Sequence, residues 1–202
     1  MSGDVGGLSY EVINTTDVEV TGRASGNTVT SIVIPATVSD GSTTYSVAAI
    51  EGGAFFANSL TSVSMPGSVT NIENGAFNSN ALTGVIIPDS VTSIGVEGPI
   101  SGPPLFGRGF TFANNALTSA AFEGNFGTFS LDMFDDNPTL STITYDEGAT
   151  GWSGEAFNNG TTVIPATSIR SASTPVPTSP IWLLGIMAGL LSLVAVRKLR
   201  KA

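Results

Sequence analysis

The 202-residue sequence contains no cysteine and no histidine. Without these two residue types the chain has no Ser-His-Asp triad, no cysteine nucleophile, no Cys/His zinc or iron–sulfur site and no disulfide bond. Charged residues are also few, at 11% of the sequence against the usual quarter. Ser, Thr, Asn and Gly take the polar positions, and this composition favours short strands and turns over helices. We expect no cofactor.

Basic residues are scarce and unevenly placed. Residues 1–180 hold 16 acidic and 3 basic side chains, a net charge of 3 − 16 = −13, while residues 181–202 hold 4 basic side chains and no acidic one, a net of +4. The first lysine is Lys198. The long acidic part therefore lacks the basic stripe that nucleic-acid binding needs, and we expect no nucleic-acid partner.

One short pattern recurs along the chain. The segment LTSVSMP (60–66) returns with related residues from positions 29, 82, 117 and 140, so that the steps between the five starts are 31, 22, 35 and 23 residues. Two steps define a unit of 22 or 23 residues, and the other two fit the same unit with insertions of about 9 and 13 residues. A fixed period of this size is typical of stacked repeat proteins.

Two further positions repeat with the same period. A phenylalanine stands in the second half of each unit, at positions 55, 77, 112, 134 and 157, and in four units an asparagine follows three residues later. We expect the phenylalanines to form a buried row and the asparagine side chains to form a ladder that satisfies backbone groups of successive loops. The ladder residues are Asn58, Asn80, Asn115 and Asn137.

The repeat predicts a mostly β solenoid of about five units. Val63 and Met65 alternate with Ser62 and Ser64, which is the period of a strand, and Pro66 ends that strand because it cannot donate to a ladder. Each unit is too small to close a core alone, but stacked units bury one another's apolar rows. We therefore expect parallel strands on one face and the phenylalanine row on the other side.

The unit resembles the bacterial BspA-like leucine-rich repeats. Residues 60–77 carry the pattern L-x-x-V-x-I-P-x-S-V-T-x-I-x-x-x-A-F nearly whole, and the resemblance covers about 29–161. It implies a curved leucine-rich-repeat solenoid, on or outside a bacterial cell, that serves adhesion or protein recognition. The family commonly has cysteine where the four ladder asparagines stand here. The resemblance implies no particular ligand.

The flanking segments divide the chain further. Residues 1–28 contain two alternating stretches, 10–12 and 18–20, around a turn at 14–17, and predict a capping β-hairpin over the first repeat of the 29–161 region. Residues 162–180 are rich in Pro, Ser and Thr and predict a linker, which leaves 181–202 as a separate C-terminal segment.

The C-terminal segment predicts a membrane anchor. Residues 181–196 carry no charge and are followed by four basic residues within the last six positions, so we expect a transmembrane helix with a cytoplasmic basic end; a buried core helix is the alternative. The layout resembles exosortase-type sorting signals of the PEP-CTERM and IPTL-CTERM kind. That resemblance implies a membrane protease of the exosortase type as a partner and processing near Pro177, Thr178, Ser179 and Pro180.

Residues 1–8 contain neither a basic cluster nor an apolar run, so no signal peptide is visible in them. Two interpretations stay open. In the first, the true start lies upstream and the protein is exported, with residues 1–180 at the cell surface or outside the cell. In the second, the protein is anchored by its tail and faces the cytoplasm.

Two surfaces are candidates for ligand binding. The outward strand positions form a small, nearly uncharged row on the concave face, suited to a protein or a glycan: Val33, Ser64, Ile86, Ala121 and Thr144. The insertion at 95–110 combines apolar residues with a scarce basic one, at Phe106, Arg108 and Phe110. The alternatives are ordinary strand residues in the first case and a tolerated surface insertion in the second.

Acidic residues supply the remaining chemical possibilities. Asp132, Asp135 and Asp136 offer clustered oxygens for calcium, but their spacing is not that of an EF-hand, and we expect no metal. A glycosidase needs only a pair of carboxylates, for which Glu73, Glu97 and Glu123 are candidates, but they show no common spacing.

The function we expect is therefore non-enzymatic. The chain is predicted to be a cell-surface or secreted protein that recognises or adheres to a protein or glycan. A structural role in an extracellular matrix or biofilm is the alternative, and a carboxylate-based glycosidase is the third interpretation.

Overall fold

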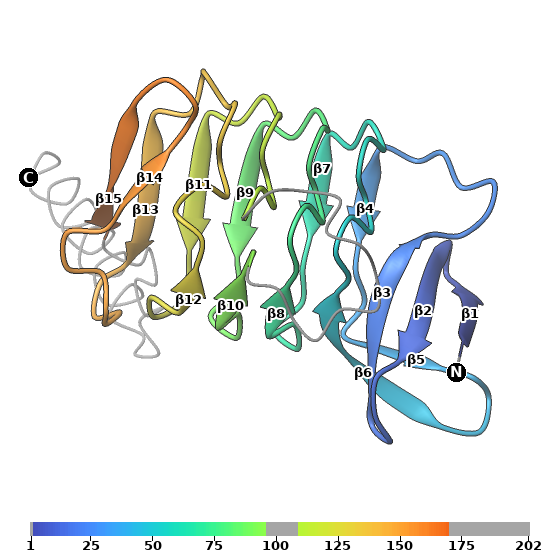
Figure 1. The fold of residues 1–202 in the computed structure, drawn as a ribbon. Coiled ribbons are helices and arrows are strands. Elements are labelled where there is room, and N and C mark those ends of the chain that lie inside the picture. The colour runs from blue at the N-terminus through green and yellow to red at the C-terminus, as the bar shows by residue number, and fades with distance from the viewer. Residues whose placement is uncertain (1, 96–108, 170–202) are drawn as a thin grey trace, which may run out of the picture. The chain divides into compact units, whose positions relative to one another are not determined.

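The computed structural model describes residues 2–95 and 109–169. The described residues all lie in one compact unit of the chain, Met1–Ile169. In this described part the structure contains strands, turns and loops but no helix (Figure 1). The fold is thus the mostly β repeat structure that the sequence predicts, whereas the transmembrane helix expected at 181–196 lies outside the described residues.

Six parallel strands of successive units form one face of the solenoid, which we call the repeat-strand face. Figure 1 shows them side by side in chain order. They are β4 (Ser31–Val33), β7 (Ser62–Ser64), β9 (Gly84–Ile87), β11 (Ser119–Phe122), β13 (Thr142–Asp146) and β15 (Val163–Ile169). Buried hydrophobic residues alternate with exposed or half-buried residues along these strands, so one side of each strand faces the core and the other faces solvent.

A second sheet closes the opposite side of the core. Its order is β1-β2-β3-β6-β8-β10-β12, with β5 paired to β6. The first strands are β1 (Ser2–Val5), β2 (Leu8–Val12), β3 (Asp17–Arg23), β5 (Thr37–Ser39) and β6 (Thr44–Ile50). The short strands β8 (Asn71–Ile72), β10 (Ser93–Ile94) and β12 (Thr128–Phe129) continue it in parallel, one for each further unit.

The N-terminal segment caps the solenoid by pairing with it directly. β2 and β3 form the antiparallel hairpin expected near residues 10–20, β1 adds a third strand, and β3 then pairs in parallel with β6. Tyr10, Val18 and Val20 are buried at this end of the core. The insertion of about 9 residues in the first unit is the antiparallel β5–β6 hairpin.

Stacked phenylalanine rings run along the core. The ring centroids of Phe55 and Phe77 lie 5.3 Å apart, those of Phe77 and Phe112 also 5.3 Å, and those of Phe112 and Phe134 5.9 Å, all in stacked geometry. Phe157 meets Phe134 edge-on at 5.5 Å. All five rings are fully buried, so each unit contributes one ring to a continuous apolar row.

The repeat region extends further than the sequence indicates. Residues 163–169, expected to belong to a linker that begins at 162, form β15, which pairs in parallel with β13 and antiparallel with β14 (Ala156–Asn158). Ile164 is only 7% exposed and closes this end of the core. The repeat-strand face therefore has six strands, one more than the five starts found in the sequence.

No helix in the described part of the chain is long and apolar enough to cross a membrane.

Candidate binding surface

The five outward residues predicted for the concave face lie on the repeat-strand face. Val33 and Ile86 are 71% and 59% exposed, Ser64 is exposed, and Ala121 and Thr144 are half-buried. Strand register places Val33 beside Ser64, and Ile86 beside Ala121, which in turn lies beside Thr144. The row continues to Thr167 on β15, a position that the sequence analysis missed.

The residues around this row are small and mostly hydroxylated. Ser31 and Ser62 face each other across β4 and β7, with their hydroxyl oxygens 2.6 Å apart, and Ser119 pairs with Thr142 across β11 and β13. Short uncharged side chains lose little conformational entropy when a ligand covers them. The face is therefore a pre-ordered surface on which few long side chains must be fixed for binding.

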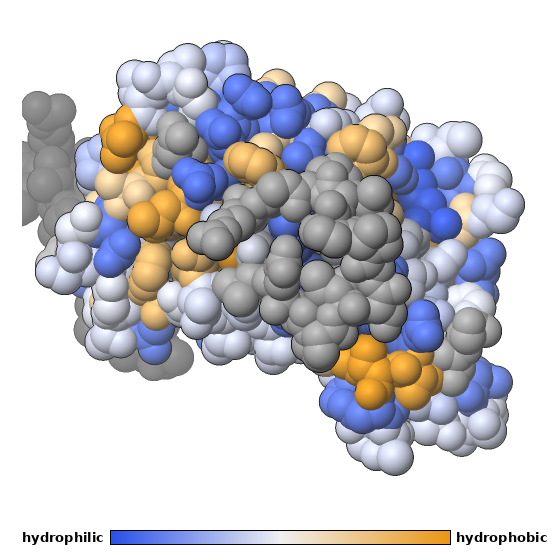
Figure 2. Space-filling view, viewed as in Figure 1, coloured by the Kyte–Doolittle hydropathy of each residue, from blue (hydrophilic) through white to orange (hydrophobic). Residues whose placement is uncertain are grey.

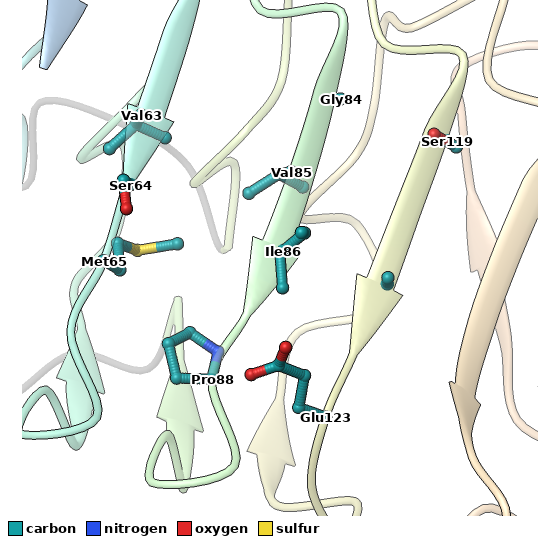
Figure 3. A pocket seen from close by; sticks show the side chains of 10 residues that line it. Val63, Ser64, Met65, Gly84, Val85, Ile86, Pro88, Ser119 and Glu123 are labelled. Carbon is teal, nitrogen blue, oxygen red and sulfur yellow. The ribbon is translucent and has the colours of Figure 1, made fainter. Parts of the chain in front are cut away.

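An open groove of about 690 Å³ crosses this face between β7, β9 and β11 (Figure 3). Its lining combines apolar side chains with a single charged one: Val63, Ser64, Met65, Gly84, Val85, Ile86, Pro88, Ser119, Ala121 and Glu123. Three residues of the predicted row, Ser64, Ile86 and Ala121, thus share one groove, whereas Val33 and Thr144 lie outside it.

Hydrophobic residues gather elsewhere on the surface as well. On the side shown in Figure 2 they collect at the β13–β15 end of the unit and beside β5 and β6, with hydrophilic residues between them. At the β15 end, Val163 and Ile169 are 68% and 42% exposed.

The predicted insertion loop lies largely beyond the described residues, and Phe106 and Arg108 fall in that part. Phe110 is half-buried, and its backbone joins the preceding unit: its N–H donates to Asn74 Oδ1 at 3.0 Å and its C=O accepts from Asn78 Nδ2 at 3.3 Å. The end of the insertion is thus anchored to the solenoid by two asparagines.

Asparagine side chains link the loops of successive units. Asn137 Nδ2 donates to Phe112 O and Phe134 O at 2.9 Å and to Asp135 O at 3.2 Å, while its Oδ1 accepts from Leu117 N–H at 3.1 Å. Asn115 and Asn80 make equivalent bonds one and two units earlier.

The two ends of the asparagine series differ from its middle. Asn58 Nδ2 donates only to the nearby Phe56 O, at 2.7 Å, so the amide of Asn58 does not reach across units in the same way. At the other end Asn159, one position earlier than the expected offset, donates to Leu140 O at 3.1 Å and accepts from the N–H groups of Thr161 and Thr162. These local bonds hold the turn that leads into β15. Asn159 is therefore the last member of the asparagine series, although it does not stand three residues after the phenylalanine of its unit.

A second pocket, of about 490 Å³, holds four glutamates where the cap joins the solenoid: Glu11, Glu19, Glu51 and Glu73. Glu11 lies directly opposite Glu19 in the β2–β3 pair, and like charges in that position destabilise a sheet. The other lining residues are apolar or neutral, so no basic side chain offsets these charges. Burial is the largest cause that raises the pKa of Glu19 to about 7, and repulsion from the charges of Glu73, Glu51 and Glu11 acts in the same direction. Burial, and then repulsion from Glu73 and Glu11, also raises the pKa of Glu51.

This glutamate pocket predicts that stability falls as pH rises. Between the ordinary glutamate pKa of 4.5 and the folded-state pKa of about 7, the folded protein holds a proton on Glu19 that the unfolded chain has lost, so raising the pH favours unfolding. The full shift corresponds to about 3.4 kcal/mol, which solvent screening of this half-buried group reduces to about 1–2 kcal/mol. Glu19→Gln should remove most of this loss.

The measurement is urea unfolding at pH 5 and at pH 8 for both proteins. Glu123→Gln, on the repeat-strand face, is the matched control and should leave the pH dependence as it is in the original protein. An equal pH dependence in Glu19→Gln and the original protein would contradict the electrostatic explanation.

The other acidic candidates do not gather in one place. Glu73 lies in the glutamate pocket, Glu123 lies in the groove of the repeat-strand face, and Glu97 lies outside the described residues. Asp132 and Asp136 are exposed and Asp135 is half-buried. Within residues 2–95 and 109–169, no group of three or more acidic side chains is close enough to hold a metal ion.

Comparison with known proteins identifies the repeat. The family model described as "BspA type Leucine rich repeat region" matches this chain in six copies, over residues 27–97 and 108–176. These ranges contain 71 and 69 residues, which together make 140 of the 202. No curated protein matches the chain.

Three solved structures show likeness to the chain. A leucine-rich repeat protein from Bacteroides capillosus is 24% identical, covering 61% of this chain and 99% of its own, with a TM-score of 0.41. One from Bacteroides ovatus is 10% identical, covering 83% of this chain and 53% of its own, with a TM-score of 0.40. A leucine rich cell surface protein from Faecalibacterium prausnitzii is 13% identical, covering 84% of this chain and 76% of its own, with a TM-score of 0.26.

Proposed function

The chain belongs to the BspA-type leucine-rich repeat family, and from this we propose that it is a non-enzymatic recognition or adhesion protein that binds a protein or glycan on its repeat-strand face. The observation that carries the proposal is the groove on that face, lined by Ser64, Ile86 and Ala121. Exposed apolar side chains on a rigid sheet mark a contact surface, because water leaves them favourably when a partner covers them.

Binding to arrays of extracellular proteins and glycans tests this function. We expect the full-length chain to bind a defined member of such an array, and the double variant Ser64→Arg/Thr144→Arg to bind it at least ten-fold more weakly, since two long cations would cover both halves of the face. Thr128→Arg, which changes an exposed residue of β12 in the opposite sheet, is the control and should bind normally. Binding by the double variant at the original strength would rule out this face.

We further propose that the repeat unit acts at the cell surface or outside the cell and that residues 181–196 anchor it to the membrane, with processing by an exosortase-type protease near 177–180. The uncharged stretch and the basic end of the chain support this proposal. Fractionation of cells that express the chain with and without residues 175–202 tests it. Loss of surface attachment on deletion is the expected result, and residence of both forms in the cytoplasm would contradict it.

The glutamate pocket favours a second candidate, a carboxylate-based hydrolase. Glu19, with its pKa raised to about 7 beside Glu51, has the properties of a general acid next to a second carboxylate. The lining contains no aromatic ring to hold a sugar, which makes this candidate weaker than the first. Chromogenic glycosides test it: hydrolysis that Glu19→Gln abolishes would establish an enzyme, and absence of turnover would remove this candidate.

A further inference from the structure

The repeat-strand face is interrupted between its second and third strands. Parallel ladders join β4 to β7 and join β9, β11, β13 and β15 to one another, but no ladder joins β7 to β9 in the described part of the chain. The two units are linked just before these strands, where Ala81 N–H donates to Leu60 O at 2.8 Å. β7 and β9 therefore lie side by side without the backbone ladder that joins the other neighbouring strands of this face.

Two inward side chains beside the interruption are less buried than their counterparts in the next unit. Val63 and Met65 occupy the inward positions of β7 and of the residue that follows it, yet both are only half-buried. Their counterparts in the next unit, Val85 and Ile87, are 5% and 1% exposed. The inward side chains on the β7 side of the interruption are therefore open to a ligand, whereas those on the β9 side are not.

The groove at this interruption has a definite chemistry. Figure 3 shows Met65 on the β7 side directed toward β9, and the Glu123 carboxylate directed toward Pro88. Ile86 is 59% exposed at the centre, and Gly84 has no side chain to cover the edge of β9. Glu123 is the only charged residue in the lining, and the lining contains no aromatic ring.

We propose that this groove binds an extended segment of a partner polypeptide, with an apolar side chain against Met65 and Ile86 and a basic side chain beside Glu123. The proposal rests on the proposed function, since it names the class of partner for the same face. An extended chain that lies over this face places alternate side chains in pockets, and the apolar lining and the Glu123 carboxylate suit an apolar and a basic side chain.

Charge and shape both favour a polypeptide of this kind. Residues 1–180 hold 16 acidic and 3 basic side chains, so a basic segment approaches an attractive field and an acidic one is repelled. The groove has no aromatic ring in its lining on which the face of a sugar could stack. A glycan would also match the half-buried apolar side chains of Val63 and Met65 poorly.

Three probes distinguish the occupants in a calorimetric titration of the full-length chain. The first is a capped hexapeptide of alternating threonine and valine that ends in lysine, the second is the same peptide ending in glutamate, and the third is cellohexaose. We expect the lysine peptide to bind at least ten-fold more tightly than the glutamate peptide, and cellohexaose not to bind.

Variants assign the binding to the groove. Glu123→Lys should reverse the preference between the two peptides, and Ile86→Lys should weaken the lysine peptide at least ten-fold. Leu131→Lys places the same charge on an exposed apolar residue that lies outside the repeat-strand face and should leave binding within two-fold of the original. All three positions are exposed, and the urea midpoint of each variant shows whether it remains folded.

Several results would overturn the proposal. These are equal binding of both peptides, an unchanged preference in Glu123→Lys, an equal loss in Leu131→Lys, or binding of cellohexaose alone. The array experiment and the peptide titration can also disagree. If Ser64→Arg/Thr144→Arg no longer binds its array partner but neither peptide binds the original protein, the proposed function is supported and the proposal of a peptide-binding groove is wrong. If neither arrays nor peptides show binding, both fall.

Discussion

Replacement of Phe77 by alanine is expected to lower the free energy of unfolding by about 3–5 kcal/mol. Phe77 is fully buried and stacks on Phe55 and Phe112, each at a centroid distance of 5.3 Å. Alanine removes both ring contacts and leaves a cavity that neighbouring units cannot fill, because their own rings are held by the next contacts in the row.

The position of Phe77 in the middle of the row should make the effect cooperative. Each unit of a solenoid is stabilised mainly by its contacts with the units on either side, so a weak central contact divides the stack. We therefore expect the unfolding transition of Phe77→Ala to broaden or separate into two steps, in addition to its lower midpoint. A single sharp transition would indicate that the unit unfolds as one block despite the cavity.

Urea unfolding followed by circular dichroism measures both effects. Phe77→Leu keeps an apolar side chain in the site and should cost clearly less than alanine, since it preserves most of the buried area. Leu131→Ala truncates a side chain that is 45% exposed and should change the free energy of unfolding by no more than about 0.5 kcal/mol. If Phe77→Ala cost no more than Leu131→Ala, the stacked row would not be a major source of stability.

The parts of this fold that are predictable from sequence are those in which every unit repeats the same residue. Phe55, Phe77, Phe112 and Phe134 each lie three residues before a ladder asparagine, and the structure stacks their rings in that order. The same holds for the outward strand row, because strand residues two apart share one side of a sheet and the period aligns them across units.

The ends of the solenoid were less predictable because terminal units depart from the common pattern. β15 lacks the leading leucine of the repeat and contains Pro165, so its composition matched a linker, yet Ile164 is buried and the strand pairs with β13. Asn159 likewise stands one residue before the expected offset. Capping units bury one side only, and their sequences therefore follow different rules.

The two pockets depend on contacts that no local pattern records. Val63 and Val85 occupy the same position in the repeat, but the first is half-buried and the second buried, and no ladder joins their strands β7 and β9. Glu11 and Glu73 are separated by 62 residues in the chain, 73 − 11, and meet only because β3 pairs with β6 and β6 with β8.

Replacement of Asn137 by alanine is expected to lower the free energy of unfolding by about 3–5 kcal/mol without removing any large apolar group. Asn137 is fully buried, and its amide serves three carbonyl groups and one N–H group drawn from two successive units. In the alanine variant Phe112 O keeps its bond from Asn115 Nδ2 and Asp135 O keeps its bond from Asn114 N–H, whereas Leu117 N–H and Phe134 O lose their bond to Asn137 in a place that excludes water. An unsatisfied buried group costs more than an average hydrogen bond contributes, so the loss exceeds that of a surface asparagine.

Two substitutions separate the hydrogen bonds from the volume of the side chain. Asn137→Asp has nearly the same shape but, when ionised, donates no hydrogen bond and places a charge among carbonyl oxygens, so it should destabilise at least as much as alanine at pH 7 and recover in part at low pH, where the acid regains one donor. Asn58→Ala removes one bond, to Phe56 O, and should cost about 1 kcal/mol. Equal unfolding midpoints for Asn137→Ala and Asn58→Ala would show that the loops are held by backbone contacts alone, and the larger loss at Asn137 would identify its amide as the link between the two units.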